Sequence, residues 1–519
     1  MTPRARSALL TGIALAPAVL FTLYLRQSRS VVVGSDGGSI ALQGWDILHG
    51  NLLLRGWAMS DVSFYPTELP QYAVLEWLRG LSPEVVHLGG AMTYTIVLLL
   101  AAVLARGMAR GRQAAVRILI AAGIMLAPAA GPGTSTLLLT PDHLGSAVPV
   151  LLAWLTIERA PARWPHQWLS LAAVGVLLAW GVLADPLVEI TGVVPVVLAC
   201  AVRSAPARQR GYELSVALAA IAAIPAAALI SALIRAAGGF ALRPVGTRSA
   251  ALAALPHNLF LTGQGLAMLF GASFGRGQAV NLLFSSLHLA GLALFAAALA
   301  VTLRRLFRPP DLVAAGLAVA VVLNVLLYAR GNYVKDLLSS REITGVLPFG
   351  AVLAGRVMAG PVLTTRAGGR IVLAPLLGAV LAGYAAVLVV YAAQPPAPAE
   401  NQDLARWLAG HHLTSGLAAS YWLANSVTVD SGGRAQVRQV SIGPRTFSRP
   451  HGGWGYARQW YQPAAHRADF VVTSAAPGTA AWHTLVNSAR NTFGAPVRTY
   501  SYRQYTVLIW GGNLLRRLG

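Results

Sequence analysis

The sequence has few charged residues and almost none of some kinds. Charged side chains make up 11% of the 519 residues, against roughly 25% in soluble domains, which excludes a chain built only of water-soluble domains. The single cysteine, Cys200, excludes an internal disulfide and a cysteine-based metal centre. Lysine occurs once, at Lys335, and there are only 18 acidic residues. The position of each acid is therefore informative.

The net charge of +22 invites a nucleic-acid interpretation. Arginine supplies nearly all of the positive charge, and it stands in short clusters between apolar runs. Cytoplasmic segments of membrane proteins have this distribution. The scarcity of lysine beside abundant Ala, Gly and Arg is typical of a high-GC bacterial genome. We therefore interpret the charge as a sign of membrane topology.

Apolar runs dominate the first three quarters of the chain. A bilayer core of about 30 Å needs roughly 20 apolar residues per helix. Eleven runs approach this length, and the first, after Arg4 and Arg6, has no clear signal-peptidase site and is taken as an uncleaved helix. The predicted spans cover residues 7–25, 84–105, 117–139, 144–158, 169–184, 187–202, 213–234, 281–303, 311–329, 343–359 and 371–392.

Arginine clusters alternate with arginine-poor turns between these spans, which predicts the orientation. The clusters expected in the cytoplasm contain Arg106, Arg110, Arg112, Arg117, Arg159, Arg163, Arg203, Arg208, Arg210, Arg304, Arg305, Arg308, Arg356, Arg366 and Arg370. The sequence thus predicts a multi-pass protein of the cytoplasmic (inner) membrane with its N-terminus inside. Loops 26–83, 235–280 and 330–342 are then extracytoplasmic.

The composition changes after the last predicted span. Residues 1–392 are predicted to form a membrane domain, 393–399 a stiff Pro-rich linker and 400–519 a small extracytoplasmic α/β domain. The fold class expected is mainly α, a polytopic helical domain followed by that α/β domain. Its predicted elements are a helix at 400–412, strands within 416–422, 426–429, 436–442 and 468–473, a helix at 479–493 and a hairpin over 497–510.

Five of the scarce acids lie in the first extracytoplasmic loop: Asp36, Asp46, Asp61, Glu68 and Glu76. Asp36 follows the first span and can cap an amphipathic helix over 37–49, which we expect at the membrane surface. A second amphipathic run covers 72–78. An ordinary helix cap is an equally good interpretation of Asp36 from local sequence alone.

Three short motifs carry a resemblance to a known family. They are Ser35-Asp36-Gly37 through His49-Gly50-Asn51 after the first span, Thr140-Pro141-Asp142-His143 before the fourth, and Ser340-Arg341-Glu342 before an apolar, Pro-containing helix. In this pattern, residues 1–392 resemble the GT-C glycosyltransferases, with protein O-mannosyltransferases and lipid A aminoarabinose transferases most similar. Gly37 stands where the family often has a second acid, and Glu342 replaces an aromatic residue.

The resemblance implies inverting transfer of a sugar from a polyprenyl-phosphate-linked donor to a glycan, lipid or protein acceptor. Such a reaction needs a base for the acceptor hydroxyl and positive charge for the phosphate. Asp36 is the candidate base and Asp142 the second acid. Candidates for the donor phosphate are Arg341, Lys335, Arg330 and Arg55, although a snorkelling role at the membrane interface explains Arg341 equally well. Candidates to line the site or bind the acceptor are Asp46, His49, Asp61, Tyr65, Glu68, His143 and Glu342.

A divalent metal (Mg, Mn or Zn) is a further option, with Asp36, Asp142 and His143 as ligands. Adjacent residues on a helix diverge by about 100°, however, and a polar turn explains Asp142 and His143 better. Two other functions stay open. One is a non-catalytic scaffold, suggested by Gly37. The other is a lipid or solute transporter, for which Glu189 inside an apolar run is the candidate.

Overall fold

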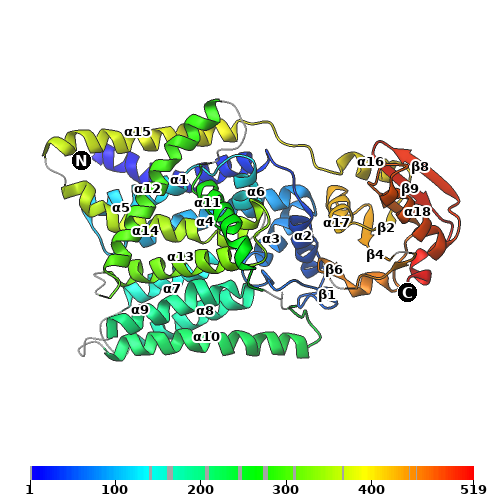
Figure 1. Ribbon diagram of the computed structural model, residues 1–519, viewed down its shortest axis with the longest axis horizontal. Helices are drawn as coiled ribbons and strands as arrows, with labels where there is room; N and C mark the ends of the chain where they lie inside the picture. The colour runs from blue at the N-terminus through cyan, green and yellow to red at the C-terminus, as the bar shows by residue number, and fades with distance from the viewer. Residues whose placement is uncertain are drawn as a thin grey trace.

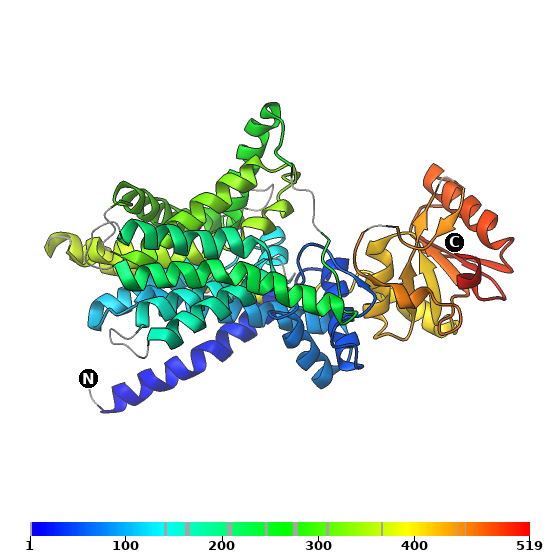
Figure 2. The ribbon, with the colours of Figure 1, turned by 90° about the horizontal axis from the view of Figure 1, so that it is seen from below.

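The computed structural model describes residues 3–139, 143–160, 167–204, 210–243, 248–272, 279–307, 311–364, 367–443, 445–451 and 453–519. A long helical bundle forms one part of the molecule, and a smaller α/β unit lies at the end opposite the N-terminus (Figures 1 and 2). This arrangement confirms the predicted fold class.

A helix lies in each of the eleven predicted spans. Among the described residues, seven helices are long and apolar enough to cross a membrane. The bundle helices are α1 (Pro3–Ser28), α4 (Pro83–Arg106), α5 (Gly111–Met125), α7 (Ala147–Arg159), α8 (Gln167–Ala184), α9 (Val194–Ser204), α10 (Arg210–Ala236), α12 (Ala279–Arg304), α13 (Leu312–Arg330), α14 (Val346–Thr364) and α15 (Ala367–Ala392). The chain is thus a multi-pass membrane protein.

Two details of the bundle differ from what the apolar runs show. The expected span 117–139 is divided, because α5 ends at Met125 and a separate short helix, α6 (Pro132–Leu138), follows a Pro- and Gly-containing break. The expected loop 235–280 contains a helix, α11 (Leu255–Leu269), that begins after the 3₁₀ turn η2 (Leu252–Ala254). α11 packs against α13 and contacts α6.

Helix α14 is the centre of the bundle. It packs against α4, α5, α12 and α13, and residues 343–356 are all buried. The 3₁₀ helix η3 (Leu338–Ile343) precedes it directly. A rigid central helix therefore fixes the position of η3, and with it the predicted phosphate-binding residue Arg341.

The two loop helices lie between the bundle and the α/β unit. Helix α2 (Ser35–Leu48) packs against α3 (Leu69–Arg79) and against α17 (Tyr421–Asp430) of the C-terminal unit. Most of α2 up to Gly44 is buried, because protein covers the helix on these two sides. A Cβ at Gly38 would contact the α17 backbone, and one at Gly44 would meet α3. The small residues allow α2 to pack closely on two sides.

The C-terminal unit is built on a five-stranded mixed sheet with strand order β3-β2-β7-β9-β8. Strand β2 runs parallel to β3 and β7, and β9 runs antiparallel to β7 and β8. The elements are α16 (Gln402–Gly410), β2 (Ser415–Ala418), β3 (Gln436–Gln439), β4 (Ser441–Ile442), β5 (Phe447–Ser448), β6 (Tyr456–Ala457), η4 (Arg458–Tyr461), β7 (Phe470–Thr473), α18 (Ala480–Phe493), β8 (Arg498–Tyr502), β9 (Tyr505–Ile509) and η5 (Leu514–Arg517).

One predicted strand of this unit is wrong, because residues 426–429 lie in helix α17. The β-branched residues Val427, Thr428 and Val429 favour a strand locally. In the structure Val427 and Val429 are buried in the hydrophobic cores, and the Thr428 hydroxyl donates to the Ala424 carbonyl at 3.0 Å. Tertiary packing overrides local propensity here.

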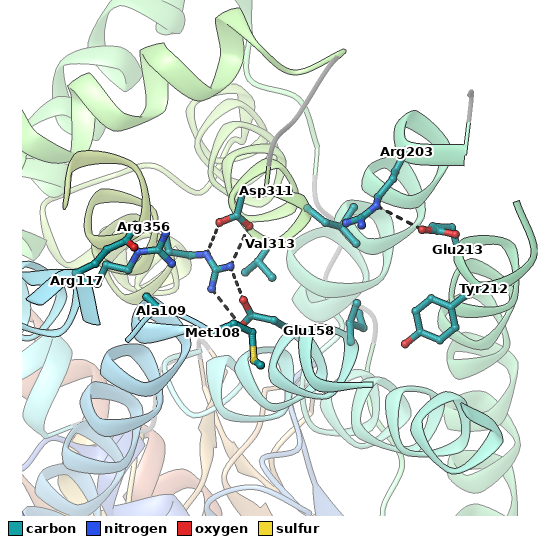
Figure 3. Close-up of a pocket in the computed structure, with 13 residues that line it drawn as sticks. Met108, Ala109, Arg117, Glu158, Arg203, Tyr212, Glu213, Asp311, Val313 and Arg356 are labelled. Carbon is teal, nitrogen blue, oxygen red and sulfur yellow. Dashed lines mark hydrogen bonds and ion pairs between the residues drawn. The ribbon is translucent and has the colours of Figure 1, made fainter. Parts of the chain in front are cut away.

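A charged cavity of about 460 Å³ lies at the end of the bundle that is opposite the C-terminal unit. Figure 3 shows the residues that line it. Arg356 stands roughly 15 Å along α14 from Val346 and pairs with Glu158 at 2.6 Å and Asp311 at 2.7 Å. The sequence predicts that Arg356 belongs to a cytoplasmic arginine cluster, and in the structure its side chain is only 5% exposed. Asp311 also caps α13 by accepting from the Ala314 amide. This cluster joins α7, α13 and α14.

Candidate functional site

Asp36 stands in the first turn of α2, just beyond α1. Gly34 is the N-cap of α2, and the helix has no side-chain cap, so Asp36 is not the capping residue that local sequence suggests. Its Oδ2 lies 3.3 Å from Nη1 of Arg341, and its Oδ1 accepts a hydrogen bond of 2.8 Å from the Tyr421 hydroxyl. The structure therefore brings the predicted base and the predicted phosphate-binding arginine into contact.

A chain of polar side chains continues from Arg341 into the bundle. Nε of Arg341 lies 3.7 Å from Oε1 of Glu342, and Oε2 of Glu342 lies 2.9 Å from Nε2 of His143. Nδ1 of His143 lies 2.7 Å from Oδ2 of Asp185, which also accepts from the Ser146 hydroxyl at 2.7 Å. Asp185 is 1% exposed and His143 11%, so this end of the chain is shielded from water.

The two carboxylates set the charge of His143. Burial alone would lower the pKa of His143, but the facing Asp185 and Glu342 outweigh burial and raise this pKa well above its ordinary value. Burial acts the other way on Glu342, but His143 and Arg341 overcome it and hold the Glu342 pKa below its ordinary value. We infer an imidazolium between two carboxylates, which fixes Glu342 beside Arg341.

Two more predicted residues lie near this chain. Burial raises the pKa of Asp61, and His143, Glu342 and Asp185 are all close enough to affect it electrostatically. Burial raises the pKa of Glu68 to about 7, and Asp185 and His143 act on it as well. A Cβ at position 145 would clash with the Glu68 carboxyl, so Gly145 makes room for that side chain.

Three predicted residues instead hold the first loop together. Asp46 Oδ2 accepts from the Asn51 amide at 2.6 Å and from the Trp57 indole at 2.7 Å. His49 is exposed and bonds through Nδ1 to the Trp45 carbonyl, and Tyr65 donates to the Leu52 carbonyl. These contacts are structural, and none of them reaches Asp36 or Arg341.

The remaining predicted residues do not contact Asp36 in the part of the chain that the structure describes. Lys335 and Arg55 are exposed, and Arg330 donates to the Ala250 carbonyl. Asp142 lies outside the described residues. Of the four predicted phosphate-binding residues, Arg341 is thus the one placed beside the predicted base.

The described residues do not favour a metal centre. No group of three or more His, Cys, Asp or Glu side chains among them is arranged to hold a metal ion. Both ring nitrogens of His143 already face carboxylates, on opposite edges of the imidazole. We therefore derive no step through a metal.

Sequence reasoning missed two members of the site. Tyr421 is separated from Asp36 by 385 residues, and no local pattern connects them. Asp185 directly precedes Pro186, which is typical of a tight turn, and its Oδ1 accepts from the Leu187 amide at 2.9 Å. Its other oxygen binds His143, and only the fold reveals that second role.

No protein-family model matches this chain, and no curated protein does. Solved structures do. ArnT from Cupriavidus metallidurans, in a crystal structure with undecaprenyl phosphate, superposes with a TM-score of 0.56 and 14% identity over 98% of each chain. The archaeal oligosaccharyltransferase AglB from Archaeoglobus fulgidus, in complex with an inhibitory peptide and a dolichol-phosphate, superposes with a TM-score of 0.51 and 12% identity, covering 92% of this chain and 71% of AglB.

The chain has the GT-C fold. A structure of an Archaeoglobus fulgidus oligosaccharyltransferase in complex with Zn and sulfate agrees, with a TM-score of 0.50 and 13% identity over 88% of this chain. The similarity to ArnT extends through the C-terminal unit, since it covers 98% of the sequence. The shared fold thus includes both sides of the Asp36–Tyr421 contact.

Proposed function

We propose that this protein is a membrane glycosyltransferase that transfers a sugar from a polyprenyl-phosphate-linked donor to an acceptor outside the cytoplasm, with inversion at the anomeric carbon. The observation that carries the proposal is the Asp36–Arg341 pair on a GT-C fold. ArnT, which shares that fold over its full length, was crystallised with undecaprenyl phosphate. A glycan, a lipid or a protein can each supply the acceptor hydroxyl.

Arg341 is placed to bind the phosphate of the donor. A guanidinium binds phosphate through two parallel N–H···O bonds, whereas its contacts to Asp36 and Glu342 are long, at 3.3 and 3.7 Å. An incoming phosphate can therefore compete for the Arg341 donors. The same charge stabilises the phosphate as it leaves. A phosphate leaving group needs no protonated acid, in contrast to glycoside hydrolysis.

Asp36 is placed to act as the general base for the acceptor hydroxyl. The acceptor oxygen forms a bond to the anomeric carbon, and the bond between that carbon and the phosphate oxygen breaks. The electron pair of the broken bond leaves with the phosphate, and the acceptor proton passes to Asp36. Asp36 is 29% exposed, so an acceptor hydroxyl can reach it.

The arginine clusters support an orientation with the N-terminus in the cytoplasm. Helix α2, which carries Asp36, and the C-terminal unit would then face the outside of the cytoplasmic membrane, since both lie at the end of the bundle opposite the N-terminus (Figure 1). This is the side on which a cell-envelope acceptor is available.

Sugar transfer from radiolabelled polyprenyl-phosphate mannose, glucose and arabinose tests the proposal in membranes that contain the full chain. We expect Asp36→Asn to lower the transfer rate by about 10²- to 10⁴-fold, the usual contribution of a general base. Asp403→Asn, at an exposed ion pair of the C-terminal unit, is the matched control and should retain the wild-type rate. Equal rates for wild type and Asp36→Asn would remove Asp36 as the base, and donor binding without transfer would favour a scaffold.

A further inference from the structure

We propose that Tyr421 is a positioning residue, through which the C-terminal domain holds the carboxylate of Asp36 in the geometry for catalysis. The inference rests on the proposed function and assigns the C-terminal domain a part in the site. Tyr421 is the first residue of α17, and its hydroxyl donates to Asp36 Oδ1 at 2.8 Å. The same hydroxyl lies 3.2 Å from the Ser35 carbonyl. Burial raises the pKa of Tyr421, so its hydroxyl keeps its proton at neutral pH.

The ring of Tyr421 is held firmly. Gly455 has a positive φ of 78°, and a Cβ there would approach Cε2 of Tyr421 to 2.4 Å. The Gly455 carbonyl accepts from the Asn425 side chain at 3.1 Å, and its amide donates to the Ala58 carbonyl at 2.9 Å. The segment against the ring is thus tied both to α17 and to the first loop.

The two domains are joined on either side of this contact. The Ser35 hydroxyl donates to the Trp422 carbonyl at 2.6 Å. Strand β1 (Trp57–Ala58) pairs antiparallel with β6. These contacts fix the Tyr421 hydroxyl relative to α2 without using Asp36. Because the position of the Tyr421 hydroxyl does not depend on Asp36, this hydroxyl can orient the Asp36 carboxylate.

The Tyr421 hydrogen bond becomes important for Asp36 when the donor phosphate binds. When the donor phosphate takes the Arg341 donors, Asp36 loses that contact. Tyr421 is then the remaining partner that the structure shows for its carboxylate. A carboxylate offers about four lone-pair positions, and the two observed contacts leave room for an acceptor hydroxyl. Tyr421 thus holds the base without blocking it.

Tyr421→Phe in the full chain tests this role, because phenylalanine keeps the ring and removes only the hydroxyl. We expect kcat for sugar transfer to fall about 10- to 100-fold, the usual effect of losing a hydrogen bond to a charged group. The donor KM should stay within about twofold, because Tyr421 does not contact the phosphate site. Thermal unfolding in detergent checks that the variant is folded.

Two control variants separate positioning from domain docking. Tyr456→Phe removes a hydroxyl of the same C-terminal unit, bonded to the Pro450 carbonyl at 3.2 Å. Arg243→Gln removes a hydrogen bond of 3.3 Å to the Gly453 carbonyl, which joins the membrane part of the chain to the C-terminal unit without involving Asp36 or Tyr421. Both should keep kcat within about twofold of wild type. A loss in either control equal to that in Tyr421→Phe, or a Tyr421→Phe effect confined to KM, would overturn the positioning role.

A separate readout distinguishes failure of this inference from failure of the proposed function. If the wild type transfers no sugar from any of the three donors, the proposed function fails. Hydrogen exchange at the first-turn amides of α2 still tests the contact, since loss of the Tyr421 hydroxyl should speed exchange there and Tyr456→Phe should not. Identical exchange in the two variants would show that Tyr421 does not hold this turn, whatever the activity.

Discussion

A substitution of His143 tests the chain of polar side chains that runs from Arg341 through Glu342 and His143 to Asp185. His143→Gln removes a cation that lies 2.7 Å from Asp185 and 2.9 Å from Glu342. Asp185 is 1% exposed and then loses the positive charge that compensates its burial. Breaking a buried ion pair by removing one partner costs about 3 to 5 kcal/mol. We expect the free energy of unfolding to fall by about that amount near pH 6.

The pH dependence of this loss follows from the two pKa shifts. The raised pKa of His143 means that its contribution is complete below the ordinary value of 6.5 and disappears as pH rises through the raised value. The lowered pKa of Glu342 means that its contribution is complete above the ordinary value of 4.5 and disappears as pH falls through the lowered value. The difference between wild type and variant is therefore largest between pH 4.5 and 6.5, and it shrinks in strong acid and strong base.

Thermal unfolding of purified protein in detergent, followed by tryptophan fluorescence from pH 4 to 10, measures this difference. His49→Gln is the control, because His49 is exposed and bonds only to a carbonyl in the described structure. It should change the free energy of unfolding by no more than about 0.5 kcal/mol. A His143→Gln effect that equals that of the control, or that does not vary with pH, would refute an imidazolium between the two carboxylates.

Two further substitutions separate a functional charge from a structural one. Arg341→Gln should raise the donor KM about 10- to 100-fold, because charge-assisted hydrogen bonds to the phosphate are lost. The control Lys335→Gln changes an exposed side chain and should change the donor KM less than about threefold. Equal effects of the two variants in the transfer assay would contradict the assignment of Arg341. Glu76 is buried, and burial raises its pKa to about 9, so wild-type stability falls as pH rises from 4.5 towards 9. Glu76→Gln should therefore stabilise the protein at pH 7 by about 1 to 3 kcal/mol. Thermal unfolding should show that this stabilisation grows as pH rises. A destabilised variant would show that the Glu76 carboxyl makes a stabilising interaction.

The sequence predicts the membrane spans and one half of the site. Apolar length and arginine placement are local signals, so the eleven helical runs could be located. The pairing of Asp36 with Arg341 followed from the family pattern, because both residues flank helices of a recognisable topology. Residues 426–429 and the helix α11 were misassigned because packing decides their conformation.

The other half of the site depends on contacts that no local pattern records. Tyr421 joins Asp36 only when the C-terminal unit docks. Arg356 resembles in sequence the other arginines that are predicted to be cytoplasmic. It is nevertheless buried, because it pairs with Glu158 and Asp311 from two other helices. The sequence also could not show that α2 is covered, because its Gly and Ser residues give no apolar signal for the face that meets α17.

The contact between Asp36 and Tyr421 has a consequence for how the protein is made. The two residues are 385 positions apart, and a ribosome adding 5 to 20 residues per second needs about 20 to 80 s to cover that distance. Throughout that time Asp36 has no tyrosine partner. If Asp36 is the base that we propose, the newly made protein becomes competent for sugar transfer only when translation is nearly finished. A chain cut short before α17 would then be an inactive precursor.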